Sequence, residues 1–210
     1  SFADSILKTL NESDDAKADG RIRNSYWFIT VLTGRTSATD PNMQQIPSRG
    51  EDAKIIKKQF IAGPGRILIK PDFSAHEIRV TGMVSGDKVI RKTFKIANES
   101  IRQLRIASTD EELEEARTNY KKNGDVHILN VRFFYNLDVD ADHPLRTDVK
   151  VTVFQTIYGS QAKSLGRQIN KSTEEAQALM DKLFETWSGA KEFMDEVKRT
   201  GSKTLRVFSP

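Results

Sequence analysis

Apolar residues in the first third of the chain follow short and mixed patterns. They recur on one side of residues 1–12, which predicts a helix, whereas β-branched and aromatic side chains over 21–33 favour a strand. A loop-like stretch follows over 34–50. The Gly-Pro-Gly turn signal at 63–65 precedes an apolar run over 66–70, and this run predicts a buried strand.

The next part of the chain shows helical spacing. Residues 74–106 predict helices, and residues 109–123 predict a further, strongly charged one. Thr109 and Glu112 form a capping-box pattern at the start of that charged helix. Because half of this helix is rich in glutamate, we expect it to be exposed to solvent.

Helical spacing continues from 125 to 199, with breaks near 136–142 and 170–172. Residues 172–175, Ser-Thr-Glu-Glu, are typical of a helix start. Residues 204–210 predict a strand or a hairpin arm. Together these patterns predict an α+β fold in which a small sheet carries a large helical insertion.

One face of the last helical region carries an ordered series of polar and aromatic side chains. The series is Arg146, Lys150, Phe154 and Tyr158, with Gly159 directly after it. Residues four apart lie almost above one another on an α-helix, so two cations and two aromatic rings share one face. At about 1.5 Å per residue the series spans roughly 18 Å, comparable to an extended nucleoside triphosphate. The pattern therefore indicates a helix that binds phosphates at one end and a base at the other.

A plain structural interpretation of the same residues is a helix with two exposed cations and two core aromatic rings. The order of the series favours the functional interpretation. Pro144 suits the first turn of this helix, and Asp142 is the expected cap. The positive end of the helix dipole then lies beside Arg146, where phosphates gain from it.

Composition narrows the class of protein. With 210 residues, 37% of them hydrophobic, the chain is long enough to bury a core. The absence of cysteine excludes disulfides and thiolate metal sites, and no apolar run reaches the ~20 residues of a membrane span. We therefore expect a cytoplasmic protein without a membrane partner. The formal net charge of +4 permits a polyanionic partner but does not establish one.

Three further blocks carry recognisable motifs. Residues 33–47 contain Thr-Gly-Arg and then Asp-Pro-Asn-Met-Gln-Gln-Ile-Pro, residues 72–79 are Asp-Phe-Ser-Ala-His-Glu-Ile-Arg, and residues 125–127 are Asp-Val-His. Followed by the series from Arg146 to Gly159, they resemble the TGR loop, motif A, a short D-x-H element and motif B of one family. That family is the DNA polymerases of the bacterial polymerase I type, family A, and the resemblance covers nearly the whole chain.

The resemblance implies that the helix face binds an incoming deoxynucleoside triphosphate (dNTP). Arg146 and Lys150 would bind the triphosphate tail, and Lys150 would also supply a proton to the pyrophosphate leaving group. Phe154 would pack against the sugar and base, and Tyr158 would lie near the templating base. His127 would hydrogen-bond the phosphates, with a purely structural role as the alternative.

Asp72 is the residue that the resemblance assigns to metal binding and catalysis. It follows the predicted strand, and carboxylates at strand ends are suitable ligands for Mg²⁺, or for Mn²⁺ in its place. Two such ions would act in the complete site. Glu77 stands where the family blocks a ribose 2′-hydroxyl, which implies selectivity for deoxynucleotides. Arg79 is expected to tie the motif down through a salt bridge or carbonyl contacts.

The resemblance also implies contacts with primer–template DNA. Part of these would reach the minor groove, whose degenerate pattern of donors and acceptors suits an enzyme that copies any sequence. The residues concerned are Thr33, Arg35, Asn42, Gln44, Tyr158 and Gly159.

The resemblance divides the chain into parts of a polymerase domain. Residues 1–20 would end a thumb or linker helix, and residues 21–79 would form part of the palm with its small antiparallel sheet. Residues 80–190 would form the helical fingers, and residues 191–210 would return toward the palm. The stretch 95–122 is longer than the matching part of the bacterial enzymes, which suggests a phage member located in the host cytoplasm.

The family's motif C, which supplies a second metal-binding aspartate, has no counterpart in this sequence. We therefore expect a fragment of a template-directed DNA polymerase that needs a second chain or segment carrying motif C for activity. An alternative is a non-catalytic nucleotide- or DNA-binding module derived from a polymerase, although the retained Asp72 and Lys150 favour the enzyme. A P-loop phosphotransferase is excluded because G-x-x-x-x-G-K-[ST] does not occur.

Overall fold

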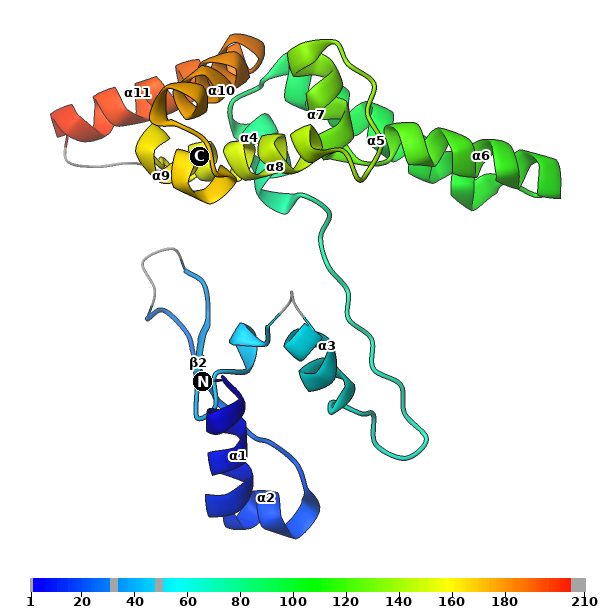
Figure 1. Cartoon of the computed structure of the whole chain (residues 1–210), viewed down its shortest axis with the longest axis vertical. Helices are drawn as coiled ribbons and strands as arrows, with labels where there is room; N and C mark the ends of the chain where they lie inside the picture. Colours follow the sequence, from blue (N-terminus) through cyan, green and yellow to red (C-terminus); the bar gives the residue numbers. More distant parts are fainter. Residues whose placement is uncertain (1, 31–33, 48–50, 205–210) are drawn as a thin grey trace. The chain divides into compact units, whose positions relative to one another are not determined.

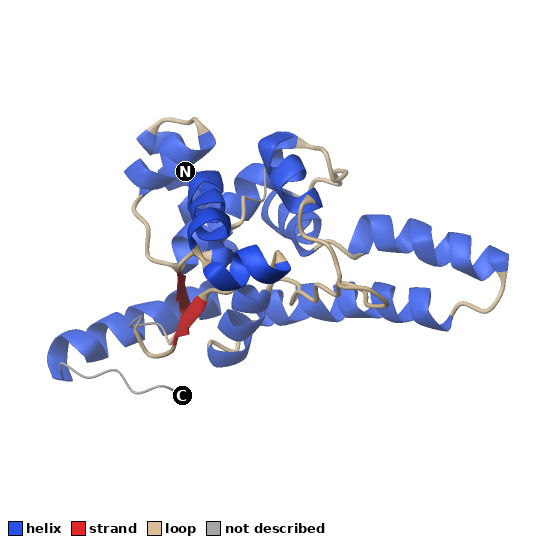
Figure 2. Cartoon of the chain, turned by 90° about the horizontal axis from the view of Figure 1, so that it is seen from below, coloured by secondary structure: helices blue, strands red, loops and turns tan. Residues whose placement is uncertain are grey.

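The computed structural model describes residues 2–30, 34–47 and 51–204, which belong to two compact units (Figure 1). The first unit is Ser1–Pro71 and the second is Asp72–Pro210. Figure 2 shows that helices dominate and that the strands form one small ribbon. The chain is thus mostly helical with a small two-stranded antiparallel sheet, as predicted.

The first unit combines short helices with the sheet. Its strands pair antiparallel with Tyr26 opposite Ala38, and the indole Nε1 of Trp27 donates to Thr39 Oγ1 at 3.1 Å. The elements are α1 (Phe2–Glu12), α2 (Asp14–Asp19), β1 (Ser25–Trp27), β2 (Ser37–Thr39), the 3₁₀ helix η1 (Met43–Gln45) and α3 (Glu51–Lys58).

The predicted helix over 1–12 is confirmed by α1, and the predicted strand over 21–33 is confirmed in its centre by β1. The loop prediction for 34–50 is wrong in part, because β2 and η1 lie within it. Ser37 and Thr39 carry little apolar signal of their own, and β2 forms because it completes the backbone ladder of β1.

The buried strand predicted over 66–70 is wrong. Ile67, Leu68 and Ile69 have no regular secondary structure, and their exposed fractions are 80%, 67% and 77%. An apolar run becomes a strand only when a neighbouring strand supplies hydrogen-bond partners, and none pairs with this run among the described residues. Asp72 therefore follows an extended, exposed segment rather than a strand end.

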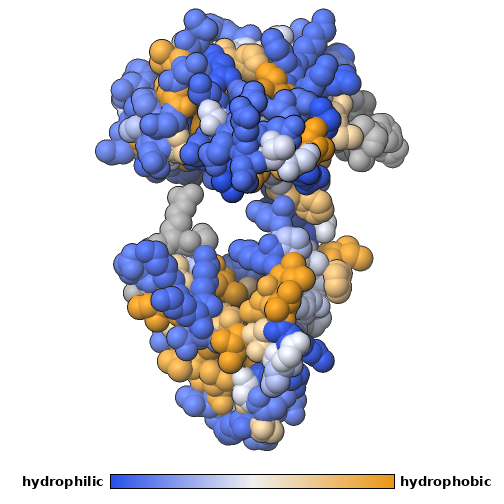
Figure 3. Space-filling model, turned by 90° about the vertical axis from the view of Figure 1, so that its right-hand side faces the viewer, coloured by the Kyte–Doolittle hydropathy of each residue, from blue (hydrophilic) through white to orange (hydrophobic). Residues whose placement is uncertain are grey.

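Apolar side chains gather on the surface of the first unit, in the lower part of Figure 3. Tyr26, Trp27, Phe28 and Ile29 are all exposed, as are Ile67 and its neighbours. The fully buried hydrophobic residues described in this unit are alanines, at 16, 38 and 53. Its described residues therefore bury no large apolar side chain.

The second unit is helical throughout its described part. The predicted helices are confirmed, and so are the breaks near 136–142 and 170–172, where Asn136 and Asn170 end helices in the left-handed conformation. The elements are α4 (His76–Val84), α5 (Lys88–Ile106), α6 (Asp110–Asn123), α7 (Val126–Tyr135), α8 (Pro144–Ile157), α9 (Ala162–Ile169), α10 (Thr173–Thr186) and α11 (Ser188–Thr204).

Local capping signals decide where several of these helices begin. The predicted capping box of Thr109 and Glu112 opens α6, and Ser172 with Glu175 forms a second one at α10. The strand or hairpin predicted over 204–210 falls almost entirely outside the described residues, and Thr204 itself ends α11.

The core of the second unit surrounds α7. Residues 126–131 are buried without interruption, and Phe134 meets the ring of Trp187 edge-on at a centroid distance of 5.7 Å. Apolar side chains from α4, α5, α8, α10 and α11 complete this core. Since α7 is enclosed by other helices, it fixes the position of α8, which packs beside it.

Helices α5 and α6 form a long hairpin that extends away from this core (Figure 1). Most of α6 is exposed, as expected, and Ala116 is its buried residue. None of the helices in the described part of the chain is long and apolar enough to cross a lipid bilayer.

Candidate functional site

The ordered series of cations and rings lies on α8, as the sequence predicts. Arg146, Lys150 and Phe154 are partly buried, and Tyr158, at the C-terminal cap, is exposed. The helix begins at Pro144, but its cap is His143, whose Nδ1 accepts from the backbone N–H of Leu145 at 3.2 Å. The predicted cap at Asp142 is therefore wrong. An N-cap side chain typically accepts from the backbone N–H two residues further on. Counted from Asp142 that residue is Pro144, which has no N–H, whereas counted from His143 it is Leu145.

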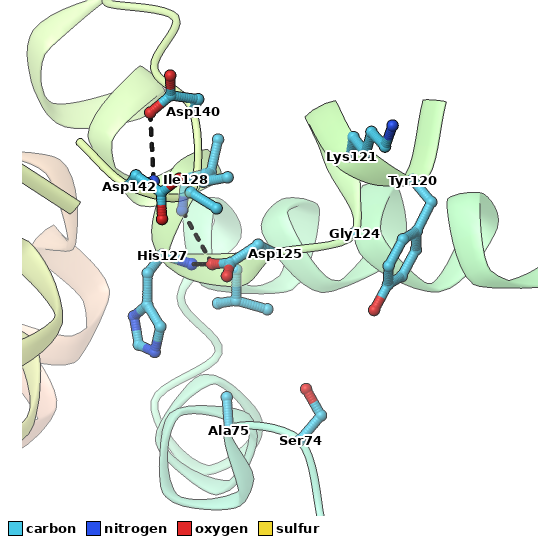
Figure 4. A pocket seen from close by; sticks show the side chains of 12 residues that line it. Ser74, Ala75, Tyr120, Lys121, Gly124, Asp125, His127, Ile128, Asp140 and Asp142 are labelled. Carbon is cyan, nitrogen blue, oxygen red and sulfur yellow. Dashed lines mark hydrogen bonds between the residues drawn. The ribbon is translucent and has the colours of Figure 1, made fainter. Parts of the chain in front are cut away.

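Arg146 is held in place by Asp125, the N-cap residue of α7. Asp125 Oδ2 accepts from Arg146 Nε at 3.1 Å and from Nη2 at 2.5 Å. Its other oxygen accepts from the backbone N–H groups of His127 and Ile128 at 2.7 and 3.1 Å. One carboxylate therefore starts α7, as Figure 4 shows, and it also fixes the arginine of α8.

Charge keeps this carboxylate ionised. Burial raises the pKa of Asp125, but hydrogen bonds from Arg146 and from the Ile128 backbone, together with the arginine charge, bring that pKa below its ordinary value. Asp125 belongs to the Asp-Val-His motif at 125–127, but the sequence alone assigns this residue no role. Its partner lies 21 residues along the chain, and no local pattern predicts such a contact.

His127 lies at the middle of the site in a neutral state. Its side chain is buried, and its Nδ1 has no hydrogen-bond partner in the structure. Burial lowers the pKa of its imidazole to about 4; the charge of Asp125 opposes this shift, whereas the charges of Lys150 and Arg146 add to it. The ring packs against Phe154 with centroids 5.9 Å apart.

Lys150 differs from Arg146 in having no anchoring contact. The structure shows no ion pair or hydrogen bond of its ammonium group with another residue in the described ranges. Its charge nevertheless acts on His127, which places it in the same electrostatic environment. The site therefore contains one fixed cation and one cation available to an added anion.

The last turn of the series meets motif A. The Tyr158 hydroxyl donates to Glu77 Oε1 at 3.3 Å, across 81 residues of sequence. Gly159 follows with a φ of 76°, in the left-handed region that favours glycine. Arg79 on the same helix as Glu77 donates from Nε to the backbone oxygen of Ser74 at 3.0 Å, which confirms the carbonyl contact predicted for it.

The structure thus brings six predicted nucleotide-site residues to one side of the helical unit. They come from α4, α7 and the whole length of α8. Contacts join them in pairs: one between Tyr158 and Glu77, and one between Phe154 and His127. The six are Glu77, His127, Arg146, Lys150, Phe154 and Tyr158.

A cavity of about 590 Å³ lies beside the start of α7 (Figure 4). Ser74 and Ala75 of motif A form one wall, and His127 lines it together with Asp125. Its remaining lining residues are Tyr120, Lys121, Gly124, Val126, Ile128, Asp140, Ala141 and Asp142. Its charged lining is mostly acidic, with Asp125, Asp140 and Asp142 against Lys121.

Asp72 does not take part in a preformed metal site. Its side chain is exposed, and the described residues contain no group of three His, Cys, Asp or Glu side chains that could hold a metal ion. One carboxylate is a poor fit for a divalent cation, which takes several oxygen ligands.

Four of the six residues predicted to contact the primer–template lie in the first unit, apart from the series in sequence. Asn42 caps η1 by accepting from Gln44 N–H at 3.1 Å, and Gln44 Nε2 donates to Thr36 Oγ1 at 2.6 Å. Arg35 is exposed. Thr33 lies outside the described residues. DNA contact by these residues stays a prediction, as does contact by Tyr158 and Gly159.

Residues 2–208 match the family model described as DNA polymerase family A. The chain belongs to DNA polymerase family A. It is 26% identical over 195 residues to DNA polymerase I of Caldicellulosiruptor bescii, covering 92% of this chain and 19% of that protein. It is 28% identical over 207 residues to DNA polymerase I of Treponema pallidum, covering 97% of this chain and 18% of that protein.

A solved structure shares the fold of this family A chain. It is the POL domain of Pol1 from M. smegmatis in complex with DNA primer-template and dNTP, with a TM-score of 0.67 and 25% identity. The match covers 95% of this chain and 30% of that one. The chain spans about a fifth of the length of the curated relatives that it matches. The predicted family is confirmed, whereas the phage origin stays a prediction.

The buried His127 predicts a specific dependence of stability on pH. Above pH 6.5 the imidazole is neutral in the folded and unfolded chains, but between 6.5 and about 4 only the unfolded chain binds a proton. Stability therefore falls as the pH falls through this window. Each pKa unit corresponds to about 1.4 kcal/mol, so the loss attributable to His127 reaches about 3 kcal/mol at pH 4.

The measurement is the free energy of unfolding in urea from pH 4 to 7.5 for the wild type and for His127→Gln. The difference between the two should change with pH across this window. The matched control His76→Gln removes an exposed histidine and should follow the wild type. Parallel curves for wild type and His127→Gln would show that His127 is not held neutral by the fold.

The Asp125–Arg146 pair predicts a second measurable effect. Asp125→Asn keeps an oxygen for the backbone caps but removes the charge that faces Arg146, so a partly buried guanidinium loses its ionised acceptor. We expect the free energy of unfolding at pH 7 to fall by about 1–3 kcal/mol. Asp138→Asn is the matched control, because Asp138 pairs with Arg132 but is 81% exposed. The exposed pair should matter by less than about 1 kcal/mol, and equal losses would contradict a special role for Asp125.

Proposed function

We propose that this chain is the nucleotide-binding part of a template-directed DNA polymerase that catalyses 5′–3′ deoxynucleotidyl transfer. The observation that carries the proposal is the gathering of the α8 series with His127 and Glu77 on one side of the helical unit. Membership of DNA polymerase family A supports it. So does the likeness to a polymerase domain whose structure contains primer-template DNA and dNTP.

In this proposal the two cations have different tasks. Arg146 is fixed by Asp125 through two of its N–H groups and offers its remaining donors to the triphosphate. Lys150 supplies the movable charge, binds the phosphates directly and donates a proton to the leaving pyrophosphate. His127 is neutral at pH 7, so it contributes a hydrogen bond rather than a charge.

The aromatic end of the series is proposed to hold the nucleoside. Phe154 packs against the sugar and base, with His127 supporting its ring from α7. The Tyr158–Glu77 hydrogen bond places a carboxylate at the end of the same series. We propose that this carboxylate excludes a ribose 2′-hydroxyl and that Tyr158 and Gly159 lie near the template.

Chemistry is proposed to need residues beyond this site. When bound, Mg²⁺ or Mn²⁺ would neutralise the triphosphate and activate the primer hydroxyl, and Asp72 would be one ligand. A segment carrying motif C would supply the second carboxylate. The same proposal includes the palm role of residues 21–79, the fingers role of 80–190 and DNA contact by Arg35, Asn42 and Gln44. It also includes the assignments made for residues 1–20 and 191–210.

Nucleotide affinity tests the proposal in the chain as it stands. We expect a dNTP to bind, and Lys150→Ala to weaken binding by about 10-fold or more, because a charge-assisted contact contributes about 1.5–3 kcal/mol. The measurement is calorimetric titration with a dNTP at pH 7 and fixed salt. Lys198→Ala on α11 is the matched control, since it removes an exposed lysine outside the site.

DNA synthesis then separates the polymerase from a non-catalytic nucleotide-binding module. We expect little or no primer extension by the chain alone and extension after a segment carrying motif C is added. Asp72→Ala should abolish the restored activity without altering dNTP affinity in the chain alone. If Lys150→Ala leaves the dNTP affinity unchanged, the proposed site is wrong. If Asp72→Ala leaves the restored primer extension unchanged, the proposed chemistry is wrong.

A further inference from the structure

A second surface lies on the helical unit, between α4 and α5. It is an open groove of about 540 Å³, within the roughly 300–1,000 Å³ of typical ligand clefts. Its α4 side is formed by Arg79, Gly82 and Met83, which lie on a different face of α4 from Glu77. The α5 side is formed by Ile90, Arg91, Phe94, Lys95, Asn98, Glu99 and Arg102.

The shape of this groove depends on a close approach of the two helices at Gly82. A Cβ at this position would lie 2.5 Å from Cγ2 of Ile90, a distance that real side chains do not tolerate. Both residues are buried. Arg79 closes one end, with its guanidinium 4.1 Å from the ring centroid of Phe94 and a hydrogen bond of 3.1 Å to Asn98 Oδ1.

Positive charge is concentrated on α5. Six cations against one anion, Glu99, give this helix a formal charge of +5, compared with +4 for the whole chain. The cations are Lys88, Arg91, Lys92, Lys95, Arg102 and Arg105. The other charged residues of the chain therefore nearly cancel, and α5 carries the net excess.

Three of these cations line the groove in one row along α5. Arg91, Lys95, Asn98 and Arg102 lie within about 60° of one another around the helix axis and line the groove together. From Arg91 to Arg102 the row is about 16 Å long, so it can follow several consecutive phosphates of a DNA strand.

Two members of the row have charge to offer. Arg102 is paired with Glu99 at 2.7 Å, whereas the structure shows no ion pair or side-chain hydrogen bond for Arg91 or Lys95 among the residues that it describes. Both are exposed. Next to them Met83 has 79% of its surface exposed, on a groove wall whose deeper part is Ile90 and Phe94.

We propose that this groove binds single-stranded DNA, with Arg91 and Lys95 on the phosphates and Met83 against a base. A single strand offers both phosphates and apolar base faces, whereas a duplex hides its base faces within the stack. An acidic peptide fits the charges but offers no flat base face to the exposed Met83. The proposal rests on the proposed polymerase function, which brings a template strand to this protein, and it gives a role to part of the 95–122 stretch.

The test measures binding of a fluorescein-labelled 20-nucleotide single strand to the full chain by anisotropy, at several salt concentrations. The variant is Arg91→Gln with Lys95→Gln, and the matched control is Lys198→Gln with Lys203→Gln on α11. Both double variants lower the formal charge from +4 to +2, so any effect of net charge is the same. Circular dichroism confirms that each variant is folded.

We expect the groove variant to bind the strand at least about 10-fold more weakly at 100 mM salt, and the control to stay within about twofold. The slope of log K against log salt should become shallower by about 1.4 in the groove variant, because each lost phosphate contact contributes about 0.7. Met83→Ala should weaken binding with the slope unchanged. A groove variant equal to the control would overturn the proposal.

Two further arms identify the ligand and separate this proposal from the nucleotide site. Preference for a blunt duplex over the single strand, or loss of binding to a polyglutamate peptide while DNA binding is kept, would overturn the assignment to single-stranded DNA. The groove variant should keep the dNTP affinity of the wild type. Failure of the nucleotide site would appear instead as a dNTP affinity that is indifferent to Lys150→Ala.

Discussion

The carboxylate of Asp125 is the constraint on which the helical unit's site depends. One of its oxygens caps α7, and the other holds the guanidinium of Arg146 on α8. Two helices that share a single carboxylate cannot slide past each other without breaking a cap or an ion pair. The pair is partly buried, with side-chain exposures of 23% for Arg146 and 28% for Asp125. Such pairs fix geometry more than they add net stability, because desolvation offsets much of the attraction.

His127 is neutral chiefly because it is buried, and the two cations of α8 add to this effect against the opposing charge of Asp125. It stands two residues after the cap, on a helix enclosed by the core, with Lys150 and Arg146 close enough for their charges to act on it. A third positive charge at this place would be disfavoured by burial and by both neighbours. The site therefore keeps its positive charge on α8, where Lys150 can follow a ligand, and uses the imidazole as a packed, uncharged neighbour of Phe154.

The local parts of this arrangement could be predicted from the sequence, and the long-range parts could not. Helix periodicity, the capping boxes at Thr109 and Ser172, and the spacing of the α8 series are properties of segments shorter than twenty residues, and the structure has them all. The prediction of a strand over 66–70 was wrong because it depended on a long-range contact. An apolar run is equally consistent with any buried element, and whether it pairs depends on a strand elsewhere. The contact between Tyr158 and Glu77 spans 81 residues and likewise follows from packing alone.

Helix α4 connects the nucleotide site with the basic groove. It has nine residues, and two different faces of it carry Glu77, which meets Tyr158, and Met83, which lines the groove. Gly82 and Ile90 are both buried, and a Cβ at Gly82 would lie 2.5 Å from Cγ2 of Ile90, so α4 and α5 approach each other closely at this point. A ligand that displaced α4 from the groove side would therefore shift the Glu77–Tyr158 contact as well. A strand bound by Arg91 and Lys95 in the proposed groove would thus lie against the same short helix that carries Glu77.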